Sequence, residues 1–288
     1  MPIVNANLDR QAYCREQVAV PGSSYYYSTL FLTPDQQSRL HPLFAFRREI
    51  LDIPSHCSDP GVARLKLQWW CEALLRSVRD GSGEHPIAAE LGMLLHTRGL
   101  GLEPLLAALL AVEAEIGPGE YPRYADLVAH CRQGYGPFWH LAARLSGSER
   151  EDALAAITEL GARIELADRL TRLGELARRG RLLLPLELLA AHGLHAAQVL
   201  VRPAPPALGT VIRGVIDLLE TDLTLALQSV PAADCARQLN ALVLGRIHLA
   251  TLAEIKRSGD VPLHHALSLT PLRKLWIAWR CYRLAKGA

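Results

Sequence analysis

Apolar residues recur three and four positions apart along most of this 288-residue chain, and glycine or proline stands at the ends of these segments. Such spacing places the apolar side chains on one face of an α-helix. We expect one helix to begin after an N-cap at Thr33 and end at Pro54, and the next to run from Pro60 to Gly81. No alternating pattern predicts strands or a β-hairpin. The sequence therefore predicts an all-α fold, with residues 1–288 forming a single domain of about ten helices.

Two predicted helices in the middle of the chain differ in regularity. Residues 121–147 follow a helical pattern that we expect to be loosened by Gly134, Gly136 and Pro137. The next segment, residues 148–180, is periodic throughout and is predicted to form one long helix with Ser146 or Ser148 as its cap.

The composition excludes several classes of protein. A formal net charge of +2 gives no general attraction for nucleic acid. The six cysteines are scattered without a C-x-x-C pair, and the amino terminus lacks the pattern of a signal peptide. The most lipid-like segment, residues 102–117, is short and carries Glu103, Glu113 and Glu115. We therefore expect a cytoplasmic protein with reduced, buried thiols and at most peripheral contact with a membrane.

Four segments together resemble the squalene/phytoene synthase family of head-to-head isoprenyl transferases. The likeness runs from about Tyr13 to Arg283, and it depends on the order and spacing of loose motifs. The segments are "SSYYYSTLFLTPDQQSRLHPLFAFRRE", the paired-tryptophan segment "LKLQWWCEALLRSVRDGSGEHPIAAEL", the basic turn "RRGRLLLPLELLAAHGL" and the carboxy-terminal "LTPLRKLWIAWR".

This resemblance implies a helical isoprenoid-synthase-type domain around a central cavity that holds prenyl chains. In active members, two aspartate-rich helices face each other and hold Mg²⁺ ions. The ions neutralise the departing diphosphate, because hard cations bind its oxygens well. Apolar and aromatic walls shelter the carbocation from water.

The first aspartate-rich motif is degenerate in this chain. The family pattern is an aspartate pair with a third aspartate one turn later, and the corresponding residues here are Leu51, Asp52 and Ser55. One acid of three remains, and Pro54 would disturb the turn that aligns the ligands. Asp52 is then either a surface or ion-paired acid, or one member of an unusual metal set.

The second motif is also degenerate. Alignment through the basic turn places Arg172 and Leu176 at the two metal-binding positions, while Asp168 and Glu165 lie one and two turns earlier. Arg172 is four residues from Asp168, which suits a salt bridge on one helix face. Three interpretations stay open: a structural ion pair, a cationic face that binds an anion, and a relocated metal site.

The second motif also carries an excess of positive charge. Residues 163–181 contain six arginines and three acids, so the balance is 6 − 3 = +3. Arginine binds phosphate oxygens bidentately without a metal. The alternative is a solvated helix end that complements the helix dipole. The resemblance implies that Ser24, Tyr26, Arg48, Arg178 and Arg181 bind substrate, and the cationic face adds Arg172 as a candidate for the same role.

Bulky residues replace small ones on the helix that lines the family's cavity. Tyr135, Pro137, Phe138 and Trp139 stand where active members have a run of alanine, glycine and valine. These side chains would fill part of the channel for two prenyl chains if they point inward. The sequence alone leaves open whether they point outward.

Two functions follow as hypotheses. The first is a non-catalytic family member with no metal cofactor, which binds an isoprenoid diphosphate or lipid, or serves as a scaffold or assembly factor for a protein partner. The second is an active transferase that joins two farnesyl or geranylgeranyl diphosphates head to head. In that case Asp52, Glu165 and Asp168 would be the catalytic and Mg²⁺-binding residues.

Overall fold

The computed structural model describes residues 3–81, 83–201, 203–258 and 267–287, and within these ranges it contains helices and no β-strand. Short 3₁₀ turns lie at Ala196–Gln198 and Ala232–Asp234. The α-helices are α1 (Ile3–Val18), α2 (Ser24–Thr29), α3 (Pro34–His56), α4 (Pro60–Asp80), α5 (Pro86–Arg98), α6 (Glu103–Ala114), α7 (Tyr124–Leu145), α8 (Glu151–Leu170), α9 (Leu173–Arg178), α10 (Leu186–Ala191), α11 (Leu208–Gln228), α12 (Leu239–Ser258) and α13 (Pro271–Gly287).

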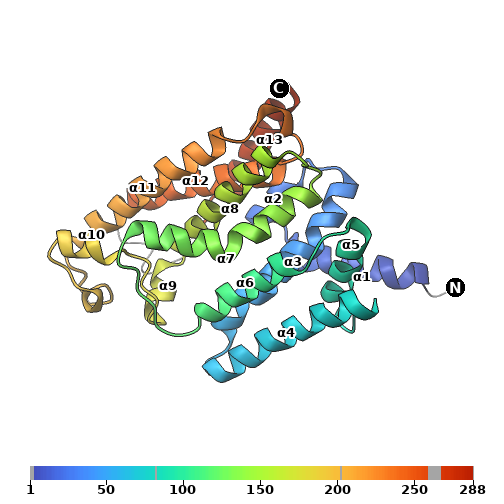
Figure 1. The fold of residues 1–288 in the computed structure, drawn as a ribbon. Helices are drawn as coiled ribbons and strands as arrows, with labels where there is room; N and C mark the ends of the chain where they lie inside the picture. Colours follow the sequence, from blue (N-terminus) through green and yellow to red (C-terminus); the bar gives the residue numbers. More distant parts are fainter. Residues whose placement is uncertain (1–2, 82, 202, 259–266, 288) are drawn as a thin grey trace.

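Helices α7 and α8 pack against each other in the middle of the bundle (Figure 1). Helix α6 covers α7, while α11 and α12 pack on α8, and α13 packs on α12 and α2. Helices α1, α3, α4 and α5 form the other half, and α3 contacts α6 and α7. The all-α fold predicted from the sequence is therefore confirmed.

Several helix ends agree with the sequence pattern. The Thr33 hydroxyl accepts from the Gln36 backbone N–H, and the Gln36 side chain accepts from the Thr33 backbone in return. This capping box begins α3 where we expected it. Gly81 ends α4 in the left-handed region, with φ of 65°, which glycine adopts without strain.

Two proline and glycine predictions were wrong. Helix α3 continues through Pro54 to His56, so the missing backbone N–H of this proline does not end the helix. Helix α7 is continuous through Gly134 and Pro137. Gly134 permits close packing of α6 on α7, since a Cβ there would lie 2.4 Å from the Cβ of Ala111.

The long helix predicted over residues 148–180 is divided in two. Helix α8 ends at Leu170, and Arg172, with φ of −114° and ψ of 24°, precedes α9. Neither predicted serine caps α8, whose N-cap residue is Arg150. The Ser148 hydroxyl instead donates to Asp234 at 2.7 Å, so tertiary packing determines its role.

None of the described helices combines the length and apolar character that a membrane crossing needs. All six cysteines are free thiols, but only Cys14, Cys131 and Cys281 are buried, so the expectation of burial holds for half of them.

Candidate functional site

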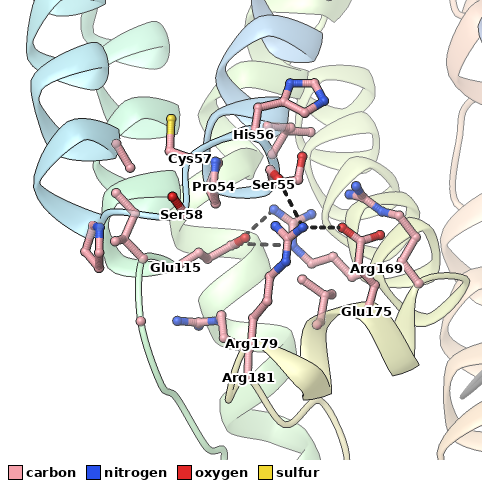
Figure 2. Close-up of a pocket in the computed structure, with 17 residues that line it drawn as sticks. Pro54, Ser55, His56, Cys57, Ser58, Glu115, Arg169, Glu175, Arg179 and Arg181 are labelled. Atoms are coloured by element: carbon pink, nitrogen blue, oxygen red, sulfur yellow. Dashed lines mark hydrogen bonds and ion pairs between the residues drawn. The ribbon is translucent and has the colours of Figure 1, made fainter.

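A cavity of about 520 Å³ lies where the carboxy-terminal ends of α3, α6 and α8 meet α9 and the start of α4 (Figure 2). Its apolar wall includes Leu51, Pro54 and Leu176, and its polar wall is mainly cationic. The charged lining consists of four arginines and two glutamates, so the formal balance is 4 − 2 = +2. These residues are Arg169, Arg172, Arg179, Arg181, Glu115 and Glu175.

Arg169 and Glu115 form the inner wall of this cavity. The Arg169 side chain is 3% exposed, and its Nε and Nη2 donate to Glu115 Oε1 at 3.1 and 2.9 Å. The same oxygen lies within hydrogen-bond distance of His130 and accepts from the Tyr135 hydroxyl. Burial alone would raise the pKa of Glu115, but Arg169 and His130 outweigh burial and lower it to about 2. Glu115 is therefore ionised, and its Oε1 is held by these partners.

Glu165, one of the two acids in the second motif, is completely buried. Arg47 on α3 donates through Nε to Oε1 at 2.6 Å and through Nη2 to Oε2 at 2.7 Å. Trp139 Nε1 donates to Oε1 at 2.9 Å, and Arg169 Nη1 donates to Oε2 at 3.0 Å. A carboxylate offers about four acceptor positions, and these four donors use them. Glu165 is thus an acceptor for protein donors from three helices.

Asp168, the other acid, lies between two cations. Its Oδ2 is 3.5 Å from Arg47 Nη2 and 3.8 Å from Arg172 Nη2, so the ion pair predicted between Arg172 and Asp168 forms. Burial would raise the pKa of Asp168, but Arg47 and Arg172 outweigh burial and lower it to about 2. The side chain is 31% exposed, which makes Asp168 the more accessible of the two acids.

Asp52 is the remaining candidate metal ligand, and it is paired on its own helix with Arg48 at 3.7 Å. Across the described ranges, no three histidine, cysteine, aspartate or glutamate side chains are grouped to hold a metal ion. Mg²⁺ requires several oxygen ligands in near-octahedral geometry. The saturated carboxylate of Glu165 and the two arginines beside Asp168 do not fit such an ion.

The predicted substrate-binding arginines of the basic turn separate into different roles. Arg172 lines the cavity, and its guanidinium makes the long contact with Asp168. Arg181 also lines it but is 6% exposed, and it donates to the Ala114 carbonyl and the Tyr121 hydroxyl, both at 2.8 Å. Arg178 is exposed and lies outside the cavity lining.

The three predicted residues of the family opening also lie outside this lining. Ser24 begins α2, and Tyr26 lines a separate pocket beside α1 and α3. Arg48 donates to the carbonyl of Gln17 at the end of α1. The structure therefore brings Arg172 and Arg181 to one cavity and places Ser24, Tyr26 and Arg48 elsewhere.

Sequence reasoning missed three residues that define the site. Arg47 rather than its neighbour Arg48 reaches Glu165, and the pair "RR" gives no local signal for this choice. Arg169 and Arg179 stood in the basic segment without an assigned role. Arg179 closes the outer wall of the cavity by donating to Glu175 at 3.1 Å and to the Ser55 carbonyl at 3.2 Å (Figure 2).

The bulky residues of α7 point inward. Tyr135, Phe138 and Trp139 are each at most 1% exposed, and the Trp139 ring meets Phe44 of α3 edge to face at 5.5 Å. These rings occupy the space between α3, α7 and α8, as the inward alternative predicted.

Comparison with known proteins agrees with this fold. The family model described as squalene/phytoene synthase matches residues 18–274. Among curated proteins, the chain is 27% identical over 188 residues to presqualene diphosphate synthase of Sinorhizobium fredii, covering 64% of this chain and 65% of that protein. It is 25% identical over 201 residues to the chloroplastic phytoene synthase of Daucus carota, covering 65% of this chain and 49% of that protein. The match thus spans about half to two thirds of these relatives.

Solved structures resemble the whole chain. The squalene synthase HpnC from Alicyclobacillus acidocaldarius has a TM-score of 0.72 at 21% identity, covering 87% of this chain and 94% of that one. A dehydrosqualene synthase in complex with ligand has a TM-score of 0.81 at 16% identity, covering 98% of each chain. At these identities the likeness concerns the fold.

Proposed function

Because the chain belongs to the squalene/phytoene synthase family, we propose that it binds the diphosphate group of an isoprenoid ligand in the arginine-lined cavity without metal-dependent condensation of two prenyl diphosphates. The observation that carries this proposal is the saturation of Glu165 by Arg47, Trp139 and Arg169. A carboxylate that already accepts four hydrogen bonds has no acceptor position left for a cation.

The charge of the cavity supports an anionic ligand. Arg169 and Arg181 are tied to buried protein acceptors, whereas Arg172 and Arg179 make longer or partly exposed ion pairs with Asp168 and Glu175. These two guanidiniums can turn toward phosphate oxygens and bind them in the bidentate manner that arginine favours.

The remaining wall suits the hydrocarbon part of such a ligand. Leu51, Pro54, Ile116 and Leu176 line the same cavity, whose volume of about 520 Å³ is in the range of small-molecule sites. The aromatic side chains around Trp139 occupy the interior, so we infer that one prenyl chain lies in this cavity rather than two in the centre of the bundle.

Calorimetric titration with farnesyl diphosphate, in EDTA and in Mg²⁺, tests the proposal. We expect binding in EDTA, and a loss of about a hundredfold or more in affinity for the double variant Arg172→Gln/Arg179→Gln, because each charged hydrogen bond contributes about 1.5–3 kcal/mol. The matched control is Arg64→Gln/Arg98→Gln, which removes two exposed charges on α4 and α5 and should leave affinity unchanged.

A turnover assay distinguishes this proposal from the alternative of an active transferase. The proposal predicts no release of diphosphate from farnesyl diphosphate in Mg²⁺. Release that requires Mg²⁺ and disappears in Asp168→Ala would instead establish an active transferase. Absence of both binding and turnover would favour the scaffold role.

A further inference from the structure

Helix α13 lies at the edge of the bundle (Figure 1), and several of its large apolar side chains are exposed to solvent. Its inner face, with Ile277, Ala278 and Cys281 buried, packs beside α12 and α2. The outer face carries five large apolar side chains that are 37–78% exposed. They are Leu272, Leu275, Trp276, Trp279 and Leu284.

The same face is cationic. Helix α13 contains five basic residues and no acid in its 17 residues. Arg280 lies over the Trp276 ring at 4.6 Å, Arg283 over Trp279 at 5.9 Å and Lys286 over the Tyr282 ring at 4.7 Å. None of these three cations has an ion pair with a carboxylate of the described residues, unlike Arg273, which pairs with Glu254 at 3.0 Å.

A groove of about 330 Å³ runs between α13 and α12 beside Trp276. Its floor is apolar and includes Leu249, Ala253 and Ile277. Three arginines stand in its lining against one acid, Glu220, whose carboxylate is paired with Lys256 at 3.3 Å. The arginines are Arg246, Arg273 and Arg280.

We propose that this face of α13 docks on the surface of a bilayer that contains anionic phospholipid. Tryptophan favours the boundary between headgroups and acyl chains, and unpaired arginine and lysine side chains are attracted to lipid phosphates. A helix of 17 residues, about 25 Å long, lies flat in this boundary when one side is apolar and its flanks are basic. Charge complementarity selects a negatively charged surface, since the helix offers no acid to a basic partner.

Vesicle co-sedimentation tests the proposal directly. The protein should sediment with vesicles of phosphatidylcholine and phosphatidylglycerol, remain largely unbound with phosphatidylcholine alone, and be released by high salt. Removing two cations in Arg280→Gln/Arg283→Gln should weaken partitioning about 30-fold, from about 1 kcal/mol for each charge near the surface. Trp276→Ala/Trp279→Ala should weaken binding even in low salt.

Matched variants distinguish an effect of this face of α13 from an effect of net charge or of an exposed tryptophan elsewhere. Arg64→Gln/Arg98→Gln removes the same net charge, and Trp69→Ala removes a tryptophan that is 40% exposed on α4. Both should bind vesicles as the parent protein does. Equal losses in the controls, or no preference for anionic vesicles, would overturn the proposal.

Three further measurements distinguish the possible outcomes. Lipids brominated on the acyl chain should quench fluorescence less in Trp276→Ala/Trp279→Ala than in the parent. If sedimentation equilibrium instead shows a dimer that this double variant abolishes, the face binds a second copy and the proposal fails. Titration with farnesyl diphosphate should be unchanged in all α13 variants, so this test stands apart from that of the arginine-lined cavity.

Discussion

Gly161 of α8 lies directly against the indole of Trp139 on α7. A Cβ placed on Gly161 would be 2.0 Å from Trp139 Cγ, far inside any real contact distance. Because Gly161 has no side chain, the Trp139 ring can lie against α8 and reach Glu165, with Nε1 2.9 Å from the carboxylate.

The first prediction concerns this contact. Gly161→Ala should lower the free energy of unfolding by about 1–3 kcal/mol or more, because overpacking displaces a buried ring. Urea denaturation measures the change, and Trp139→Leu in the same chain should recover part of it. Gly214→Ala is the control, since a Cβ there meets nothing within 4 Å in the middle of α11 and should be neutral or stabilising. Equal losses at both positions would contradict the explanation.

The second prediction concerns the buried ion pair between Arg47 and Glu165. Glu165→Gln removes the charge that compensates Arg47 and Arg169, so we expect a loss of about 3–5 kcal/mol in the free energy of unfolding. Asp80→Asn breaks a pair with Arg79 that is exposed on both sides and should leave the free energy of unfolding nearly unchanged. Similar effects for the two substitutions would show that the buried network contributes no more than a surface pair.

The third prediction concerns stability in acid. The pKa of Glu115 is about 2 in the folded chain, below its ordinary value of 4.5, so the unfolded chain binds more protons between these values. The ionised Glu115 therefore contributes on the order of 3 kcal/mol to the free energy of unfolding. This contribution is fully present above about pH 5 and is lost as the pH falls toward 2. Denaturation at several pH values should show a shallower acid limb in Glu115→Gln. Glu113→Gln, an exposed neighbour, should keep the parent slope.

The fourth prediction separates the two kinds of cavity arginine. Arg181→Gln removes donors to the Ala114 carbonyl and the Tyr121 hydroxyl and should destabilise the fold by about 1–3 kcal/mol. The Arg181→Gln variant should lose less affinity for inorganic pyrophosphate than the Arg179→Gln variant does. Arg179→Gln should leave the free energy of unfolding nearly unchanged. Calorimetric titration and urea denaturation of both variants check this, and the reverse order of effects would contradict it.

Much of the helical fold could be predicted from the sequence because periodicity and caps are local signals. Thr33, Gly81 and the periodic segments mark their helices correctly. The break at Arg172 had no such signal, since neither Thr171 nor Arg172 excludes a helix. Pro54 led to the opposite error, because a proline removes its own backbone donor without necessarily ending the helix.

The site was predictable only in part, for a related reason. Glu165, Asp168 and Arg172 could be found by their spacing within one segment. Arg47 lies 118 residues from Glu165, so their contact is a product of tertiary packing. The direction of Trp139 likewise depended on Gly161, on another helix.

Arg47, Trp139 and Arg169 converge on Glu165 from α3, α7 and α8, and this convergence restricts how the chain can change over generations. Replacing one of these three donors leaves the other two bonded to Glu165. Replacing Glu165 leaves all three donors without this acceptor. Introducing an aspartate at position 172 alone would therefore not create a cation site. Coordinated substitutions on at least two helices would be needed to free the Glu165 carboxylate, so no single substitution gives this chain a cation site.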